Sequence, residues 1–144
     1  MKKRLFGLFF AACLLLTAVS CEKEVIYDST VTRTYDIMSR NWKATEDGFS
    51  VILDVPEITR DVLDYGSVQC FIIYPDGAQT CLPAQRYLSY EYVDETTGKK
   101  NVGYYQKLID FEYNLGEVNV YYTMSDFYYE TNPEELTVKV IVHY

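Results

Sequence analysis

The chain has 144 residues, a length that suits one domain with a single core and is too short for two. Its formal net charge is −8, with 21 acidic against 13 basic residues, and this acidity argues against a nucleic-acid-binding protein, which needs a basic surface for phosphates. The hydrophobic fraction of 49% and the charged fraction of 24% are typical of a globular protein and argue against a disordered one.

Residues 1–20 have the features of an export signal. Residues 2–4 are Lys-Lys-Arg, and the 15 residues from Leu5 to Val19 are uncharged and mostly apolar. A membrane-spanning helix needs about 20 such residues, so this shorter run indicates the core of a signal peptide. The run ends in Thr-Ala-Val-Ser-Cys at 17–21, which resembles the lipobox of bacterial lipoproteins, where the signal is cut before a cysteine that then carries lipid. We expect a lipoprotein signal peptide over residues 1–20 and lipidation of Cys21, with plain secretion as the alternative.

Residues 21–30 are expected to form the lipidated N-terminus and a polar tether. Cleavage after residue 20 leaves 10 basic against 21 acidic residues, a net charge of −11. Glu22, Lys23 and Glu24 resemble the charged export tag of surface lipoproteins in Bacteroidota, and position 22 is not the Asp that retains enteric lipoproteins at the inner membrane. The expected location is the outer membrane, lipid-anchored and facing the surface, with the periplasmic face as the alternative.

Residues 31–144 are expected to form one β-sandwich domain. Apolar and polar residues alternate over 49–55, 118–124 and 136–143, as in strands with one buried face. Further strands are expected over 32–37, 68–74, 79–83, 87–93 and 102–113. About eight strands at short spacing predict an all-β fold, an antiparallel β-sandwich of the immunoglobulin-like or fibronectin-like type.

Two short segments carry other signals. Trp42, the only tryptophan, precedes the strand at 49–55, and a lone Trp in a small sandwich most often fills the space between the sheets. Thr59 can cap a helix over residues 60–65, and Gly66 stands where a left-handed C-cap residue belongs. The sequence therefore predicts a core tryptophan and one short helix.

Cys70 and Cys81 are the cysteines left to pair, because Cys13 leaves with the signal and Cys21 takes lipid. An exported chain with one remaining pair suggests a disulfide. A hairpin turn at Pro75-Asp76-Gly77 separates the two cysteines. A bulged turn would set Cys81 opposite the residue after Cys70, on the other face, whereas a two-residue connection would set the cysteines opposite each other but does not suit proline. A Cys70–Cys81 disulfide and two separate thiols both remain open.

Five tyrosines lie on two runs joined by the polar segment 94–101. Folding these runs as a hairpin would bring Tyr90 opposite Tyr104 or Tyr105, depending on whether Gly98 forms a bulge. Tyrosine combines a flat apolar body with a polar tip, which suits protein and sugar partners. The alternative is that these are half-buried sandwich residues. The candidate ligand contacts are Tyr90, Tyr92, Tyr104 and Tyr105.

Catalytic signals are weak in this chain. A Ser-His-Asp or Cys-His system needs a histidine, and the single one, His143, falls on the polar face of the last expected strand. Asp110 with Glu112, or Glu134 with Glu135, could form a glycosidase pair, but 21 acids in one small domain produce such pairs by chance. A zinc site takes three or four ligands. We therefore expect no enzyme, no catalytic residue, no metal and no cofactor.

Several short motifs occur together between residues 36 and 144. They are the strand around Trp42, Val55-Pro56-Glu57-Ile58-Thr59 before the short helix closed by Gly66, the Leu82-Pro83 step, Ile109-Asp110-Phe111-Glu112-Tyr113, and Ser125-Asp126-Phe127 before the last strand. With the lipid-tagged cysteine, they resemble a group of small, uncharacterised lipid-anchored envelope lipoproteins of Bacteroidota. The resemblance implies a single all-β domain on a lipid anchor, and it implies no activity.

The expected function is that of a non-enzymatic cell-envelope lipoprotein with a binding or structural role. A recognition module would carry a contiguous tyrosine patch of more than about 300 Å², whereas a structural subunit would leave a long unprotected edge strand. A surface glycan- or protein-binding module of a nutrient-uptake system is the alternative function. Because the mature chain carries a net charge of −11, a neutral glycan or a basic envelope protein is the expected partner, and nucleic acid is not.

Overall fold

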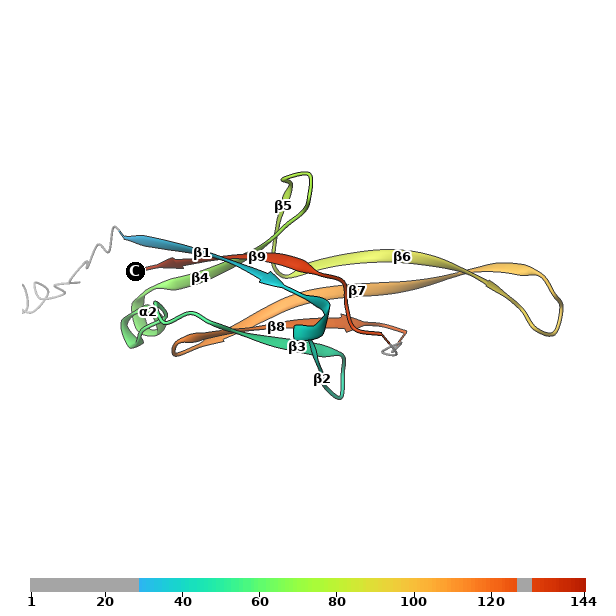
Figure 1. The fold of residues 1–144 in the computed structure, drawn as a ribbon, viewed down its shortest axis with the longest axis horizontal. Coiled ribbons are helices and arrows are strands. Elements are labelled where there is room, and N and C mark those ends of the chain that lie inside the picture. Colours follow the sequence, from blue (N-terminus) through green and yellow to red (C-terminus); the bar gives the residue numbers. More distant parts are fainter. Residues whose placement is uncertain (1–28, 127–130) are drawn as a thin grey trace, which may run out of the picture.

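The computed structural model describes residues 29–126 and 131–144, and these form two antiparallel sheets (Figure 1). The first sheet has the order β1 (Thr30–Ile37), β9 (Leu136–His143), β4 (Ser67–Ile73), β5 (Gln79–Cys81). The second has the order β2 (Lys43–Ala44), β3 (Phe49–Asp54), β8 (Glu117–Met124), β7 (Lys100–Asn114), β6 (Ala84–Val93). The predicted all-β sandwich is confirmed.

The strands agree closely with the alternation of apolar and polar residues. Each of the eight expected segments corresponds to a strand, and the additional strand β2 has only two residues, too few to produce a pattern. In β9 the side chains of Val138, Val140 and Val142 are fully buried, while the residues between them are partly exposed. In β8 Val118 and Val120 are also fully buried. The core therefore lies between the inward faces of the central strands. Every second side chain of a strand points to this side, because successive side chains alternate between the two faces.

Trp42 belongs to this core, as its sequence context predicts. Its side chain is only 4% exposed, and its ring meets that of Tyr122 edge to face with the centroids 5.8 Å apart. The indole Nε1 donates a hydrogen bond to the carbonyl oxygen of Glu134 at 3.3 Å. A buried Trp contributes a large apolar area to the core, and here its one polar atom also has a hydrogen-bond partner.

The short helix α2 (Arg60–Tyr65) begins as predicted but ends differently. The Thr59 hydroxyl accepts a hydrogen bond from the Val62 amide at 3.5 Å, and Val62 is fully buried. The prediction of a left-handed C-cap at Gly66 is wrong, because its φ is −99°. A Cβ at this position would lie 2.2 Å from the carbonyl oxygen of His143. Glycine is needed here for a close approach of two backbones, and not for a positive φ.

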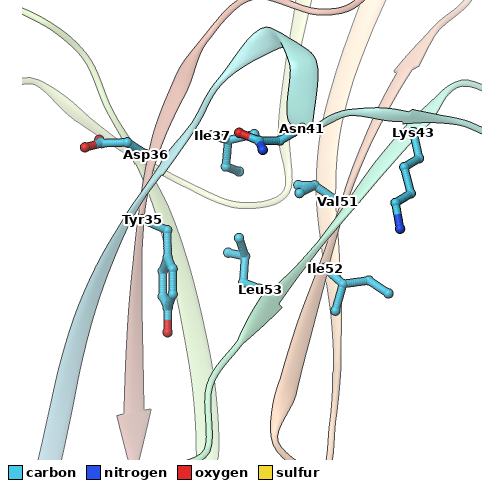
Figure 2. A pocket seen from close by; sticks show the side chains of 8 residues that line it. All are labelled: Tyr35, Asp36, Ile37, Asn41, Lys43, Val51, Ile52 and Leu53. Carbon is cyan, nitrogen blue, oxygen red and sulfur yellow. The ribbon is translucent and has the colours of Figure 1, made fainter.

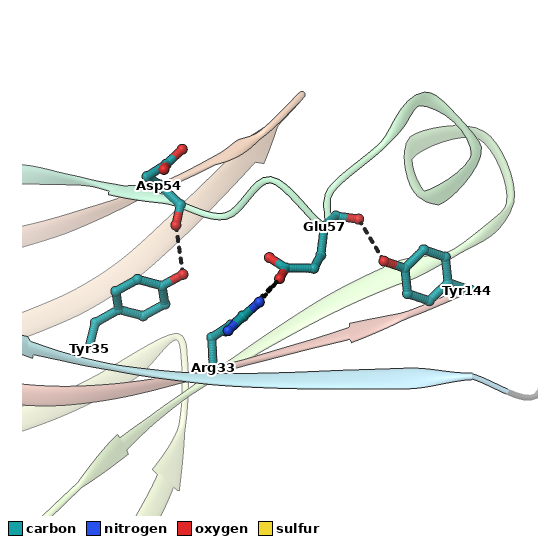
Figure 3. A network of polar contacts seen from close by, with 5 residues as sticks. All are labelled: Arg33, Tyr35, Asp54, Glu57 and Tyr144. Carbon is teal, nitrogen blue, oxygen red and sulfur yellow. Dashed lines mark hydrogen bonds and ion pairs between the residues drawn. The ribbon is translucent and has the colours of Figure 1, made fainter.

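Polar side chains tie the edge strand β1 to the second sheet (Figure 3). The hydroxyl of Tyr35 donates to the carbonyl oxygen of Asp54 at 2.7 Å, and the Arg33 guanidinium forms an ion pair with Glu57. The hydroxyl of Tyr144 donates to the carbonyl oxygen of Glu57 at 3.1 Å. The Arg33 hydrogen bond lowers the pKa of Glu57, and the same contact raises the pKa of Arg33. These contacts link β1 and the C-terminal residue to the segment that leads into α2.

The hairpin of β6 and β7 extends beyond the rest of the sandwich (Figure 1). Strand β7 pairs with β8 from Lys107 to Asn114, but it pairs with β6 from Lys100 to Ile109. Over the residue pairs from Tyr87–Gln106 to Val93–Lys100, the sheet therefore consists of β6 and β7 alone. We call residues 87–106 the overhanging ribbon, and it lies at the end of the molecule opposite to the start of β1.

Candidate functional site

The overhanging ribbon carries most of the exposed large hydrophobic side chains. Eleven such side chains are exposed among the described residues, and six of them belong to the ribbon. The six are Tyr87, Tyr90, Tyr92, Val93, Val102 and Tyr104. Exposed apolar side chains gathered on one element mark a candidate interaction surface.

The turn of the ribbon sets a register that differs from the expected one. Tyr90 lies opposite Gly103, so the prediction that it faces Tyr104 or Tyr105 is wrong. The Asp94 amide donates to the carbonyl oxygen of Lys99 at 2.9 Å, which closes a four-residue loop. The Asp94 carboxylate also accepts bonds from two loop amides, at 2.8 Å and 3.0 Å, and these bonds lower the pKa of Asp94. Side-chain bonding of this kind stabilises a tight loop and decides the pairing.

The register divides the tyrosines between two faces of the ribbon. Tyr90, Tyr92 and Tyr105 lie on the face that continues the core side of the sheet, because this face also carries the buried Ile109. Tyr104 lies on the opposite face and is 75% exposed. The structure therefore brings together three of the four candidate contacts and separates the fourth from them.

Tyr90 is at the centre of the inner-face group. Its ring lies over Gly103, where a Cβ would be 2.5 Å from a ring carbon. Its centroid is 5.9 Å from that of Tyr92 and 6.1 Å from that of Tyr105. An isolated glycine inside a strand often marks a close approach of this kind, and it is the sequence signal that indicates where Tyr90 lies.

A pocket of about 390 Å³ opens beside these rings. It is lined by Tyr90, Tyr105, Met124 and Asp126. Its volume is at the lower end of the range for small-ligand sites, and its lining combines aromatic, thioether and carboxylate groups. Met124 and Asp126 were not among the expected contacts, because they belong to β8 and the turn after it, far from the ribbon in sequence.

A charged row separates the inner-face tyrosines from the core. Lys107 lies opposite Arg86, and its Nζ is 2.6 Å from a carboxylate oxygen of Glu134. Burial lowers the pKa of Lys107, but the hydrogen bond to Glu134 and the charge interactions with Tyr122, Glu134 and Tyr105 together outweigh it, and the pKa is raised. The Arg86 guanidinium lies 5.2 Å from the centroid of the Tyr74 ring. The core thus ends at this row, and the tyrosines beyond it are not core residues.

A second pocket, of about 330 Å³, lies between β1 and β3 (Figure 2). Two of the polar side chains that line it, Asn41 and Asp36, have hydrogen-bond partners within the protein. Asn41 accepts a hydrogen bond from the Met38 amide at 2.8 Å, and Asp36 accepts one from the Thr137 hydroxyl at 2.8 Å. Its apolar wall includes buried core residues such as Ile37. This pocket lacks the grouped aromatic rings that line the pocket of the ribbon.

The two cysteines form no disulfide in the structure. Cys70 is a buried free thiol and Cys81 an exposed one, because Cys81 pairs with Phe71. Residues one step apart in register have side chains on opposite faces. Of the two alternatives, a disulfide and two separate thiols, the structure therefore shows the two separate thiols. Burial raises the pKa of Cys70 to about 12, and the nearby Cys81 adds to the shift.

Thiol labelling is expected to distinguish the two cysteines. In folded protein at pH 8, iodoacetamide should modify Cys81 and leave Cys70 unmodified, because the reactive thiolate of Cys70 is almost absent below its raised pKa. Peptide mass mapping after labelling, without and with denaturant, checks this expectation. A Cys70–Cys81 peptide that stays linked until it is reduced would contradict it.

The acidic pair Asp110 and Glu112 and the histidine His143 lie on different sheets. Asp110 and Glu112 lie on the outer face of β7, where burial, and next the charge of Glu112, raises the pKa of Asp110. The Tyr121 hydroxyl donates to Glu112 at 3.1 Å. His143 Nδ1 is 3.4 Å from the Thr30 hydroxyl. Within residues 29–126 and 131–144, no three His, Cys, Asp or Glu side chains are grouped so that they could hold a metal ion.

The expected signal peptide and lipidation site lie outside the described residues, so the structure does not test them. The described part of the chain contains no helix of the length and apolarity needed to cross a membrane. Comparisons with protein-family models, with curated proteins and with solved structures found no match to this chain.

Proposed function

We propose that this chain is a non-enzymatic outer-membrane lipoprotein, anchored through lipid at Cys21, that binds a partner through the overhanging ribbon. The observation that carries the proposal is the position of the exposed tyrosines on two strands beyond the sandwich. The ribbon continues the strands of the sheet but has no third strand beside it, so a partner that covers it would add contacts that the sandwich does not supply. Exposed aromatic side chains supply the contact area that such a partner would bury.

The position of the ribbon also suits a lipid-anchored protein. Strand β1 begins nine residues after Cys21, at the end of the sandwich opposite to the ribbon (Figure 1). A tether at that end would leave the ribbon pointing away from the membrane. A partner could then reach the ribbon without contacting the lipid surface.

A second candidate function is glycan binding, as in a surface module of a nutrient-uptake system. The pocket lined by Tyr90, Tyr105, Met124 and Asp126 supports it. Aromatic rings can stack on the apolar face of a sugar ring, and a carboxylate can accept hydrogen bonds from sugar hydroxyls. The mature net charge of −11 favours a neutral glycan over an acidic one.

Tyr90→Ala and Tyr105→Ala are each expected to weaken partner binding by about 1 kcal/mol or more, roughly fivefold in affinity. The physical reason is the loss of aromatic contact area from the inner face of the ribbon. Binding is measured by capture from a solubilised envelope fraction and on an array of neutral glycans. Tyr65→Ala is the matched control, because Tyr65 is 75% exposed but belongs to α2.

Three results bear on this proposal. Binding that falls in both ribbon variants and not in Tyr65→Ala supports it. Binding that is equal in all variants contradicts it and places the site elsewhere. A wild-type protein that binds nothing on the array and nothing from the envelope fraction contradicts the proposal as a whole.

A further inference from the structure

Strand β6 is the edge strand of its sheet, and its protection is limited to two charged side chains, Arg86 on the inner face and Glu91 on the outer face. The sheet has the order β2-β3-β8-β7-β6, so β6 pairs on one side only. Its ten residues pair with β7 without interruption, from Ala84 to Val93, and they include neither proline nor lysine. Natural proteins usually block a long edge with proline, lysine, a bulge or a covering element, because an open edge accepts further strands.

The register identifies the backbone groups at the open edge. The Asp94 amide bonds to the Lys99 carbonyl, and hydrogen-bonded pairs alternate with non-hydrogen-bonded pairs along an antiparallel ladder. On the other side of β7, the Gln106 amide donates to the hydroxyl of Ser125, the residue after β8, and the Gln106 carbonyl accepts from the Ser125 amide. Both contacts agree with this alternation. Within the ribbon, therefore, Leu88, Tyr90 and Tyr92 bond to β7. The amides and carbonyls that point to the open edge are those of Tyr87, Ser89, Glu91 and Val93.

We propose that β6 receives an extended strand of another protein, which pairs with the outward backbone groups of Tyr87, Ser89 and Glu91. This inference rests on the proposed function, in which the ribbon is the binding element, and it names the form of the partner. Strand addition is an established mode of protein recognition, in which backbone hydrogen bonds contribute affinity and alternate side chains contribute specificity. A third strand would also add contacts that the sandwich does not supply to the ribbon.

The side chains of β6 define the chemistry of the added strand. On the inner face it would lie beside Leu88, Tyr90 and Tyr92, which pair best with aromatic or β-branched side chains. On the outer face it would lie beside Glu91, where a basic side chain is favourable and an acidic one is not. The mature net charge of −11 favours the same choice at longer range. The partner segment is therefore an apolar, alternating strand with a basic residue on its polar face.

A second copy of this chain fits the edge less well. Two β6 edges related by a two-fold axis run antiparallel, so the two sandwiches would point in opposite directions. The N-terminal ends of β1, to which the expected lipid tether joins, would then lie at opposite ends of the pair (Figure 1). Two copies anchored in one membrane would not meet in this way, and for this reason the inference assigns the strand to a different protein.

The test compares Ser89→Pro with Ser89→Ala in the full-length lipoprotein. Proline removes the outward amide of residue 89 and no bond to β7, and proline is tolerated where a strand amide faces outward. The probe is the detergent-solubilised envelope fraction of the cells that make the protein. We expect captured protein to fall at least about tenfold with Ser89→Pro, the equivalent of about 1.4 kcal/mol, and to stay unchanged with Ser89→Ala.

Amide hydrogen exchange provides a measurement that needs no variant, and it decides if Ser89→Pro fails to fold. In the free protein the amides of Tyr87, Ser89 and Glu91 should exchange fast, and those of Leu88 and Tyr90 slowly. In the purified complex all five should exchange slowly. Both results together support strand addition.

The remaining outcomes each contradict a defined part of the argument. Equal capture by a folded Ser89→Pro variant, or fast exchange at Ser89 in the complex, overturns strand addition; the proposed function then stands if Tyr90→Ala still reduces capture. A captured partner identified as a second copy overturns the assignment to a different protein. A ribbon that binds only array glycans overturns strand addition in favour of the pocket. A wild-type protein that captures nothing and binds no glycan overturns both proposals.

Discussion

Trp42→Ala is expected to destabilise the fold by about 3 to 5 kcal/mol, the range measured for removal of a buried large aromatic side chain. The indole is only 4% exposed, and its loss would leave a cavity beside the Tyr122 ring. The Glu134 carbonyl would also lose its donor. Because total stability is commonly about 5 to 15 kcal/mol, the change removes a large share of it. Denaturant unfolding followed by circular dichroism measures the effect.

Tyr65→Ala serves as the control for this prediction. Its side chain is 75% exposed, so its replacement should change stability by no more than about 0.5 kcal/mol. A Trp42→Ala variant that keeps its unfolding midpoint but loses partner binding would overturn the prediction. Trp42 would then be a ligand contact and not a structural residue.

Cys21→Ala is expected to release the protein from membranes almost completely. Each buried CH₂ of an acyl chain contributes about 0.8 kcal/mol to membrane binding, and a lipoprotein cysteine carries several chains. Removing the thiol removes the attachment site for all of them. Membrane fractionation measures the release, and the intact mass of the wild-type protein should include the acyl groups.

Cys81→Ala is the matched control for membrane release, because Cys81 is an exposed thiol that carries no expected lipid. This variant should stay with the membrane fraction. A wild-type protein that begins at Cys21 without acyl groups would show that the chain is secreted and not anchored. The binding role of the ribbon would be unaffected by that result, since it depends on residues 87–106.

Local sequence rules predicted the elements that depend on near neighbours. The alternation of valine with polar residues in β9 predicts a strand with one buried face, and the structure buries that face. Thr59 caps α2 because its hydroxyl needs only the amide three residues later. The bulged turn after Cys70 sets Cys81 opposite Phe71, since a turn of known length defines the pairing on both sides of it.

Contacts between distant segments could not be assigned from the local sequence, because an isolated glycine can indicate a close approach but does not identify the residue that approaches. Gly66 is required by the carbonyl of His143, which lies 77 positions later in the chain. Gly103 lies under Tyr90 because the loop closed by Asp94 and Lys99 moves the register one residue from the expected Tyr90–Tyr104 pair, and two from the expected Tyr90–Tyr105 pair. A one-residue shift exchanges the two faces of a strand, and for this reason the sequence alone could not group Tyr90 with Tyr105 and apart from Tyr104.

The sequence by itself determined the all-β class, most strand positions, the short helix and the core position of Trp42, because periodicity, capping and hydrophobicity act over a few residues. Only the tertiary structure decided that the tyrosines of residues 87–106 lie beyond the sandwich. Whether a strand face is covered depends on which strands of the other sheet lie opposite it, and β7 extends past the strand β8 that supports it. The inward face of β7 carries Ile109 and Phe111 on one side of that boundary and Lys107 and Tyr105 on the other. The local pattern therefore changes there, but it does not show which strands lie beside or opposite residues 87–106.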